Sequence, residues 1–248
     1  LIAERNTALG KIQLPSVRLG YEWTLIDLLR KCIDSNVNSE NKALAVKMRD
    51  WLSQKQAIFP LIWSNMLTQS DEFYLGISSS GGFIDGNEND NFTDGLFDLK
   101  NLISIKEDPA TNIASMEASL KSIQQHRIYA RLWRSQLLLR DYLQQMTIDI
   151  SAWASTYTCG TRKDREKLAI IRNVFTLFFI DEIQGIGAQM NQYHYALKPE
   201  FLKLIDDNHL PRNFTSTIEQ YSQLGFDGYQ NAMLAHIEMW QDIFKKCD

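Results

Sequence analysis

The residues best suited to hold a metal ion lie in an acidic, asparagine-rich stretch, residues 85–93. Oxygen-bearing side chains alternate there at steps of two, and a tight loop can turn them toward one point, as calcium requires. The candidate ligands are Asp85, Asn87 and Asn89. An EF-hand loop would need glycine where Asp90 stands and a bidentate glutamate where Leu96 stands. The alternative is a solvated acidic loop that needs no cofactor, and we favour it.

The sequence lacks the patterns typical of a nucleophilic serine, a zinc site or a dinucleotide-binding site. The four histidines, at positions 126, 194, 209 and 236, form no HExxH pair, and no serine lies in a GxSxG turn. Gly185 and Gly187 lack the third glycine of a dinucleotide fingerprint. The sequence therefore favours a protein that is not an enzyme. The alternative is a helical ligand-binding protein or enzyme whose pocket is lined by several helices.

The three cysteines are too far apart in the sequence for a zinc site or a disulfide framework. Cys32 lies on the predicted apolar stripe of a helix, which favours a small core residue. Cys159 and Cys247 each follow a long predicted helix, so they are a candidate disulfide if those two ends are adjacent. One disulfide would suit an exported protein and three free thiols a cytoplasmic one.

A basic stripe is the clearest candidate for binding another protein. Arg127, Arg131 and Arg134 recur at helical spacing on one long predicted helix. Such a stripe either faces solvent or binds an acidic surface. That surface belongs either to another protein or to the acidic segment of this chain. Tyr129 and Trp133 leave the main apolar stripe of the same helix, so they form either a second packing face or an exposed contact patch.

Composition indicates an ordinary globular chain of 248 residues, with 44% hydrophobic and 23% charged residues. The formal net charge of -4 disfavours nucleic acid as a partner, because phosphate binding needs a basic surface. The longest apolar run, residues 174–180, is much shorter than the roughly 18 residues that indicate a transmembrane helix. We therefore expect no transmembrane segment in this chain.

Helical periodicity dominates outside residues 70–108, so the sequence predicts an all-α fold. Helices are expected over about 21–33, with Leu25, Leu28, Leu29, Cys32 and Ile33 inward, over 40–56, and over 57–66 as a separate helix because of Pro60. Asp108 and Pro109 predict a helix start, a change of register is expected near 124–126, and Gly160 is the expected end of a long helix. Thr161 and Asp164 predict a capping box, and residues 174–180 a central buried helix.

Residues 70–108 differ in kind from the rest of the chain. Nine acidic residues and two lysines give this stretch a charge of -7, and five of the twelve glycines fall within it. We interpret it as an acidic Gly/Asn-rich loop insertion between helices, with short strands near 73–77 and 99–105. The predicted architecture is a single helical domain over residues 1–248, an irregular multi-helix bundle that contains this insertion.

Several short segments resemble the IcmX/TraW-type periplasmic subunits of type IVB secretion and conjugation systems. They are Leu139-Arg140-Asp141-Tyr142, Thr147-Ile148, Ser151, the run 175–183 that ends in Glu182-Ile183, and the run 97–103. The resemblance implies a non-enzymatic, exported, helical assembly component located in the periplasm. Without it, the cytoplasm remains the expected location.

Together these observations predict a non-enzymatic interaction or assembly protein, a scaffold or a machinery subunit that binds other proteins. A homo-oligomer is one such assembly. The contacts are expected from the acidic insertion and the arginine stripe.

Overall fold

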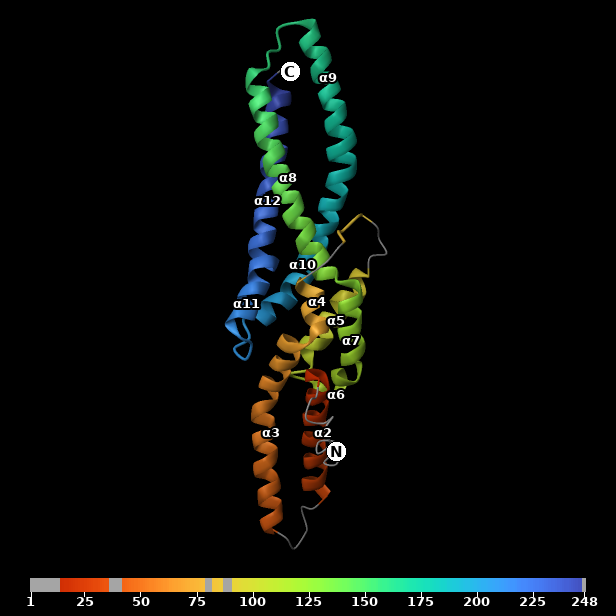
Figure 1. Cartoon of the computed structure of the whole chain (residues 1–248), viewed down its shortest axis with the longest axis vertical. Helices are drawn as coiled ribbons and strands as arrows, with labels where there is room; N and C mark the ends of the chain where they lie inside the picture. Colours follow the sequence, from red (N-terminus) through yellow and green to blue (C-terminus); the bar gives the residue numbers. More distant parts are fainter. Residues whose placement is uncertain (1–13, 36–41, 79–81, 87–90, 247–248) are drawn as a thin grey trace. The chain divides into compact units, whose positions relative to one another are not determined.

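The computed structural model describes residues 14–35, 42–78, 82–86 and 91–246, and all regular structure in these ranges is helical (Figure 1). The predicted all-α class is confirmed. No helix in these ranges is both long and apolar enough to cross a membrane. The chain divides into two compact units. Unit 1 comprises Leu1–Ser78, Thr93–Arg127 and Lys203–Thr215, and unit 2 comprises Ser79–Phe92, Ile128–Leu202 and Ser216–Asp248. A single domain over residues 1–248 stays a prediction.

Unit 1 begins with two packed helices, α2 (Pro15–Ser35) and α3 (Lys42–Gln69). A buried carboxylate, that of Glu22, joins them. One of its oxygens accepts a hydrogen bond from Nε of Arg18 at 3.1 Å, and the other accepts one from Nζ of Lys55 on α3 at 2.8 Å. A buried charge without a partner costs several kcal/mol. This ion triad therefore fixes which side of α2 faces α3.

The predicted inner face of the first helix is wrong. Leu28 and Cys32 are exposed, and burial on α2 follows Ser16, Leu19, Glu22 and Ile26. The reason is the pairing of Glu22 with α3, which periodicity of apolar residues does not register. The predicted separate helix over 57–66 is also wrong, because α3 continues through Pro60. Buried Phe59 and Trp63 flank this proline, so packing offsets the lost backbone hydrogen bond.

The remaining helices of unit 1 correct the interpretation of residues 70–108. They are α4 (Asp71–Ser78), α5 (Phe92–Ser104), α6 (Pro109–Asn112), the 3-10 turn η2 (Ile113–Ser115) and α7 (Met116–His126). The predicted strands lie within or overlap α4 and α5. Phe73, Leu99 and Leu102 are buried, so α4 and α5 contribute side chains to the core of unit 1. Acidic composition misled the prediction, because Asp71 and Asp94 are exposed on helices whose apolar side chains are buried.

Two local predictions in this region are confirmed. The Asp108 carboxylate accepts a hydrogen bond from the backbone N–H of Thr111, and Pro109 opens α6. The expected change of register near 124–126 is a helix break: Arg127 has a left-handed backbone with φ of 47°, and its N–H donates to the carbonyl of Ile123. A new helix then begins at Ile128.

The remaining helices are α8 (Ile128–Thr156), α9 (Arg162–Val174), the π-helix η3 (Phe175–Ile183), α10 (Gln184–Ile205), α11 (Arg212–Glu219), the π-helix η4 (Gln220–Leu224) and α12 (Gly225–Lys245). They belong to unit 2 except for residues 203–215, which include the end of α10 and the start of α11. Contacts between α8 and the η4–α12 segment pair Trp133 with Tyr221 and Thr147 with His236, in ascending order. These helices therefore run parallel. Phe179 contacts His236 and Phe175 contacts Trp240, so α9–η3 runs antiparallel to α12 (Figure 1).

The start of α9 was predicted correctly, and the burial of the segment that follows α9 was not. Thr161 and Asp164 form the expected capping box. The helix before it ends at Thr156, four residues before Gly160, so Gly160 is not its cap. The predicted central buried helix is wrong: Val174, Leu177 and Phe178 are exposed, and Phe179 is the buried residue of η3. Only one side of this segment meets α12, which leaves its other apolar side chains on the surface.

We predict that Gly76→Ala destabilises unit 1. A Cβ at this position of α4 would lie 2.2 Å from Cγ2 and 3.2 Å from the carbonyl oxygen of Ile123 on α7. Relieving such overlap costs roughly 1–3 kcal/mol. Chemical denaturation followed by circular dichroism measures it. Gly20→Ala on α2 is the control, since no atom lies within 4 Å of its Cβ. Alanine should stabilise α2 by roughly 0.5–1 kcal/mol, and equal effects of both changes would contradict the prediction.

Candidate functional site

Unit 1 brings a serine, a histidine and an aspartate together on α5 and α7, in an order that does not suit a nucleophile. The hydroxyl oxygen of Ser122 lies 3.3 Å from Nδ1 of His126, and Asp98 is hydrogen-bonded to Ser119 and Ser122. In a catalytic triad the carboxylate orients the imidazole, whereas here it contacts the serines. Burial raises the pKa of Asp98, against the opposing effect of these hydrogen bonds. The group is a polar cluster in the packing of α5 against α7.

Two histidines of unit 2 are buried and held neutral. The indole N–H of Trp240 donates to Nε2 of His236 at 3.0 Å, so that nitrogen carries no proton. The Thr147 hydroxyl donates to the carbonyl of Leu143, which leaves Nδ1–H of His236 to donate to Thr147. Burial lowers the pKa of His236. The ring of His194 stacks on Phe226 at 3.4 Å, and burial, aided by the charge of Lys198, lowers its pKa to about 4.

The structure describes only one of the three predicted calcium ligands. Asp85 is exposed, and Asn87 and Asn89 lie outside the described ranges. Within those ranges, no group of three or more His, Cys, Asp or Glu side chains is arranged to hold a metal ion. The calcium site therefore stays a prediction.

The arginine stripe is interrupted by the break at Arg127, whose Nε donates to the carbonyl of Gln124. The other two arginines hold the segment 82–86 of unit 2. Arg131 donates two hydrogen bonds to the carbonyl of Phe83, at 2.9 and 3.2 Å, and the guanidinium of Arg134 lies 4.8 Å from the centre of the Phe83 ring. These residues therefore bind part of the predicted acidic stretch, through a backbone carbonyl and a ring.

The two aromatic residues expected beside this stripe form a packing face, the first of the two roles open for them. Tyr129 is 0% exposed and Trp133 is 4% exposed. Trp133 stacks on Tyr221, with centroids 5.5 Å apart, and the rings of Tyr129 and Trp133 each contact the ring of Phe201. The other role, an exposed contact patch at these two positions, is therefore wrong.

The ends of α8 and α12 meet, as the candidate disulfide required. Nζ of Lys246 donates to the carbonyls of Ala154 and Tyr157, and Sγ of Cys159 lies 3.6 Å from the carbonyl oxygen of Lys246. Cys159 is disulfide-bonded, and Cys32 is exposed. Cys247 lies outside the described residues, so its pairing with Cys159 stays a prediction.

Exposed apolar side chains form a stripe on α8. Leu143 and Thr147 face α12, because Leu143 is in the core and Thr147 bonds His236. Tyr142 and Met146 lie one residue earlier, roughly 100° around the helix. With Leu138 and Trp153 they make a stripe whose members are 38% to 63% exposed. Met146 and Trp153 lie beside the core of unit 2 and not in it.

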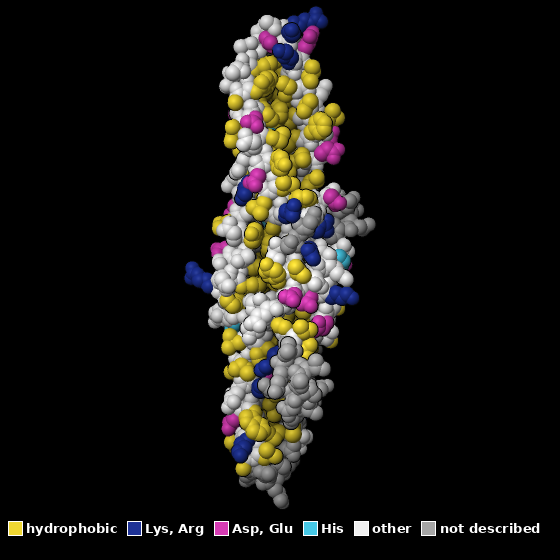
Figure 2. All heavy atoms as spheres, viewed as in Figure 1, with side chains coloured by type: hydrophobic (Ala, Val, Ile, Leu, Met, Phe, Trp, Pro, Cys, Tyr) yellow, Lys and Arg dark blue, Asp and Glu magenta, His cyan; other side chains and the backbone are white. Residues whose placement is uncertain are grey.

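A second stripe follows α9 and η3 with the same offset. Ile171, Phe175 and Phe179 pack on α12 or its core neighbours, and Ile170, Val174 and Phe178 lie one residue before them. These three, with Leu177, are 47% to 64% exposed. Because α8 and α9–η3 run antiparallel, equal offsets place both stripes on the same side of this helix pair. Figure 2 shows hydrophobic side chains gathered in a band where α8 and α9 lie in Figure 1.

We call these eight residues the apolar surface of unit 2. A large side chain presents roughly 150–250 Å² when fully exposed. At the observed exposures of 38% to 64%, the eight together present roughly 800 Å². The largest apolar patch of a typical monomer is roughly 300–600 Å². The sequence contained a signal for this surface. Residues 174–180 carry more apolar side chains than a helix can bury on one packed face, so some of them must remain exposed.

Charged residues extend the second stripe at both of its ends. Lys163 and Lys167 precede Ile170 by seven and three residues, and Glu182 follows Phe178 by four. These three side chains and that of Asp181 are exposed. The apolar surface therefore has a basic end at the start of α9 and an acidic end at the end of η3.

We predict that unit 2 loses stability as the pH falls from about 6.5 to about 4. Unfolded histidines take up protons below a pKa of about 6.5, whereas His194 and His236 have lowered pKa values in the fold. The unfolded state then binds more protons, so the free energy of unfolding decreases with falling pH. Denaturation at pH 7.5 and 5 measures this loss. His194→Phe keeps a ring stacked on Phe226 and should reduce the loss, and an unchanged loss would contradict the assignment to His194.

We predict that alkylation of the denatured, unreduced protein from its native host labels one cysteine. Cys32 should react, and Cys159 and Cys247 should not. Mass spectrometry before and after reduction counts the thiols. A Cys32→Ser variant is the control and should take up no label until it is reduced. Labelling of all three cysteines in the wild type would rule out the disulfide.

Comparisons with known proteins identify a family and nothing closer. A search of curated proteins and a search of solved structures each found no match. One family model, described as "Protein of unknown function (DUF3080)", matches residues 1–248. The match covers both compact units. The chain therefore belongs to the DUF3080 family.

Proposed function

We propose that this protein is a non-enzymatic interaction protein that assembles through the apolar surface of unit 2. The observation that carries the proposal is the roughly 800 Å² of apolar side chains on α8 and α9–η3, a common size for one partner's share of a stable protein interface. The serine, histidine and aspartate that unit 1 brings together are not in catalytic order, because Asp98 contacts the serines and not His126. Membership of a secretion machinery rests on the sequence resemblance alone.

The occupant that fits this surface best is a second copy of the chain. A two-fold axis across the stripe would bring the basic end of one copy, Lys163 and Lys167, against the acidic end of the other, Asp181 and Glu182. Each copy then supplies one half of both charge contacts. Opposite charges at the rim steer association and fix the register, and the apolar centre supplies the burial.

We predict that Ile170→Asp converts a dimer to a monomer. A carboxylate buried within the interface loses its hydration, which opposes association. Analytical ultracentrifugation should show at least a tenfold weaker association. Ile148→Asp is a matched control: Ile148 is 63% exposed, as Ile170 is, but lies roughly 200° around α8 from Met146. This variant should remain dimeric. A monomeric wild type, or equal masses for both variants, would overturn the proposal.

A charge-swap experiment separates a second copy from any other partner. The variant Lys163→Glu/Lys167→Glu and the variant Asp181→Lys/Glu182→Lys should each associate poorly, because each repels itself. Mixed together they should form a heterodimer, since both contacts are then attractive. The effect should weaken with added salt. Failure of the mixture to associate, while the wild type dimerises, would reject this two-fold arrangement.

A further inference from the structure

Unit 1 contains a cavity of about 330 Å³ between α2, α3 and residues 106–110. Its apolar side is aromatic. The ring of Trp23 on α2 and that of Phe59 on α3 lie 6.2 Å apart at 56°, and the buried side chain of Ile26 also lines the cavity. Two tilted rings with an open space beside them are suited to hold a planar apolar group.

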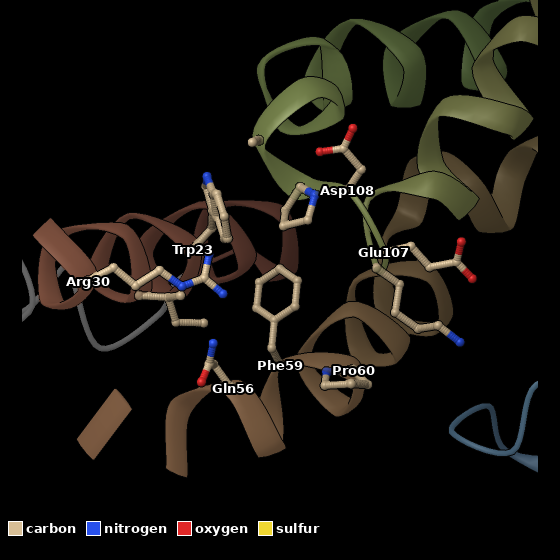
Figure 3. Close-up of a pocket in the computed structure, with 11 residues that line it drawn as sticks. Trp23, Arg30, Gln56, Phe59, Pro60, Glu107 and Asp108 are labelled. Carbon is tan, nitrogen blue, oxygen red and sulfur yellow. The ribbon is translucent and has the colours of Figure 1, made fainter. Parts of the chain in front are cut away.

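Arg30 supplies a positive charge at this cavity. The guanidinium of Arg30 lies 5.6 Å from the centre of the Trp23 ring, and Arg30 is in no ion pair within the described ranges. Figure 3 shows Arg30 and Gln56 directed toward the space between Trp23 and Phe59. The neighbouring residue, Lys31, is instead paired with Asp27 at 2.6 Å.

The other charged residues around the cavity are engaged elsewhere or point away. Lys106 is paired with Asp207 and lies over the ring of Trp63, 5.1 Å from its centre. The Asp108 carboxylate caps α6 by accepting from Thr111. In Figure 3 the carboxylate of Glu107 points away from Trp23 and Phe59, and that of Asp108 points away from Phe59. The inner part of the cavity is therefore apolar with a positive charge at one side.

We propose that this cavity binds a small planar organic anion, an arene carboxylate or a close analogue. The ring system would lie against Trp23 and Phe59, and the carboxylate would accept two parallel hydrogen bonds from Arg30. The Gln56 amide has an N–H₂ group to donate to the same anion. Most ligand pockets have this composition, a largely apolar lining with a few directed polar groups. This site is separate from the apolar surface of unit 2 and does not depend on it.

Calorimetry with 2-naphthoate, and with neutral 2-naphthamide as its isostere, tests the proposal. The wild type should bind naphthoate at least tenfold more tightly than naphthamide. Arg30→Gln should remove that preference and leave naphthamide binding within twofold. Lys31→Gln is the matched control, because it removes an adjacent exposed charge that does not line the cavity, and it should change neither affinity.

Two results would overturn the proposal: no naphthoate binding by the wild type at millimolar concentration, or equal naphthoate affinity of the wild type and Arg30→Gln. The Ile170→Asp variant distinguishes binding in this cavity from binding on the apolar surface of unit 2. It should bind naphthoate as the wild type does, whatever its oligomeric state. Loss of naphthoate binding in Ile170→Asp would place the ligand on the apolar surface of unit 2 and reject the cavity.

Discussion

The packing of Phe175 and Phe179 against α12 decides which side chains of unit 2 are buried and which are exposed. These rings contact Trp240, Phe244 and His236, and they set the rotation of α9–η3. A helix that meets one neighbour buries one stripe, so the residues one position earlier remain outside. The π-helical segment spreads the apolar run further, because more residues are needed for each turn. The same contacts that make the core therefore also make the apolar surface.

Local signals in the sequence predicted local structure well. The caps at Asp108 and at Thr161 were predicted correctly because a capping side chain, its backbone partner and a proline lie within a few residues of one another. The change of register before Ile128 was also visible, since the apolar stripes on its two sides do not align. What these signals share is that no distant part of the chain has to be known.

Predictions that depend on distant partners failed. The run 174–180 is apolar on nearly every side, and the sequence does not show that only α12 would cover it. Residues 70–108 are acidic and glycine-rich on average, yet Phe73 and Leu99 are fully buried. Periodicity identified α2 but missed its inner face, because the residue that sets this face, Glu22, is charged. The predicted exposed contact role of Trp133 failed for the same reason, because its packing partner, Tyr221, lies 88 positions away in the chain.

The ion triad of unit 1 links its packing to its cavity. Glu22 pairs with Lys55 across the α2–α3 interface, and this contact fixes the rotation of α2. Trp23 is the next residue, and Arg30 follows it by seven residues, two turns along the same side of the helix. On α3, Phe59 lies one turn after Lys55. Because the buried charge of Glu22 is costly unless it is paired, its pairing brings Trp23, Arg30 and Phe59 to one cavity. Hydrophobic packing alone would allow α2 to rotate by one residue and would not specify this arrangement.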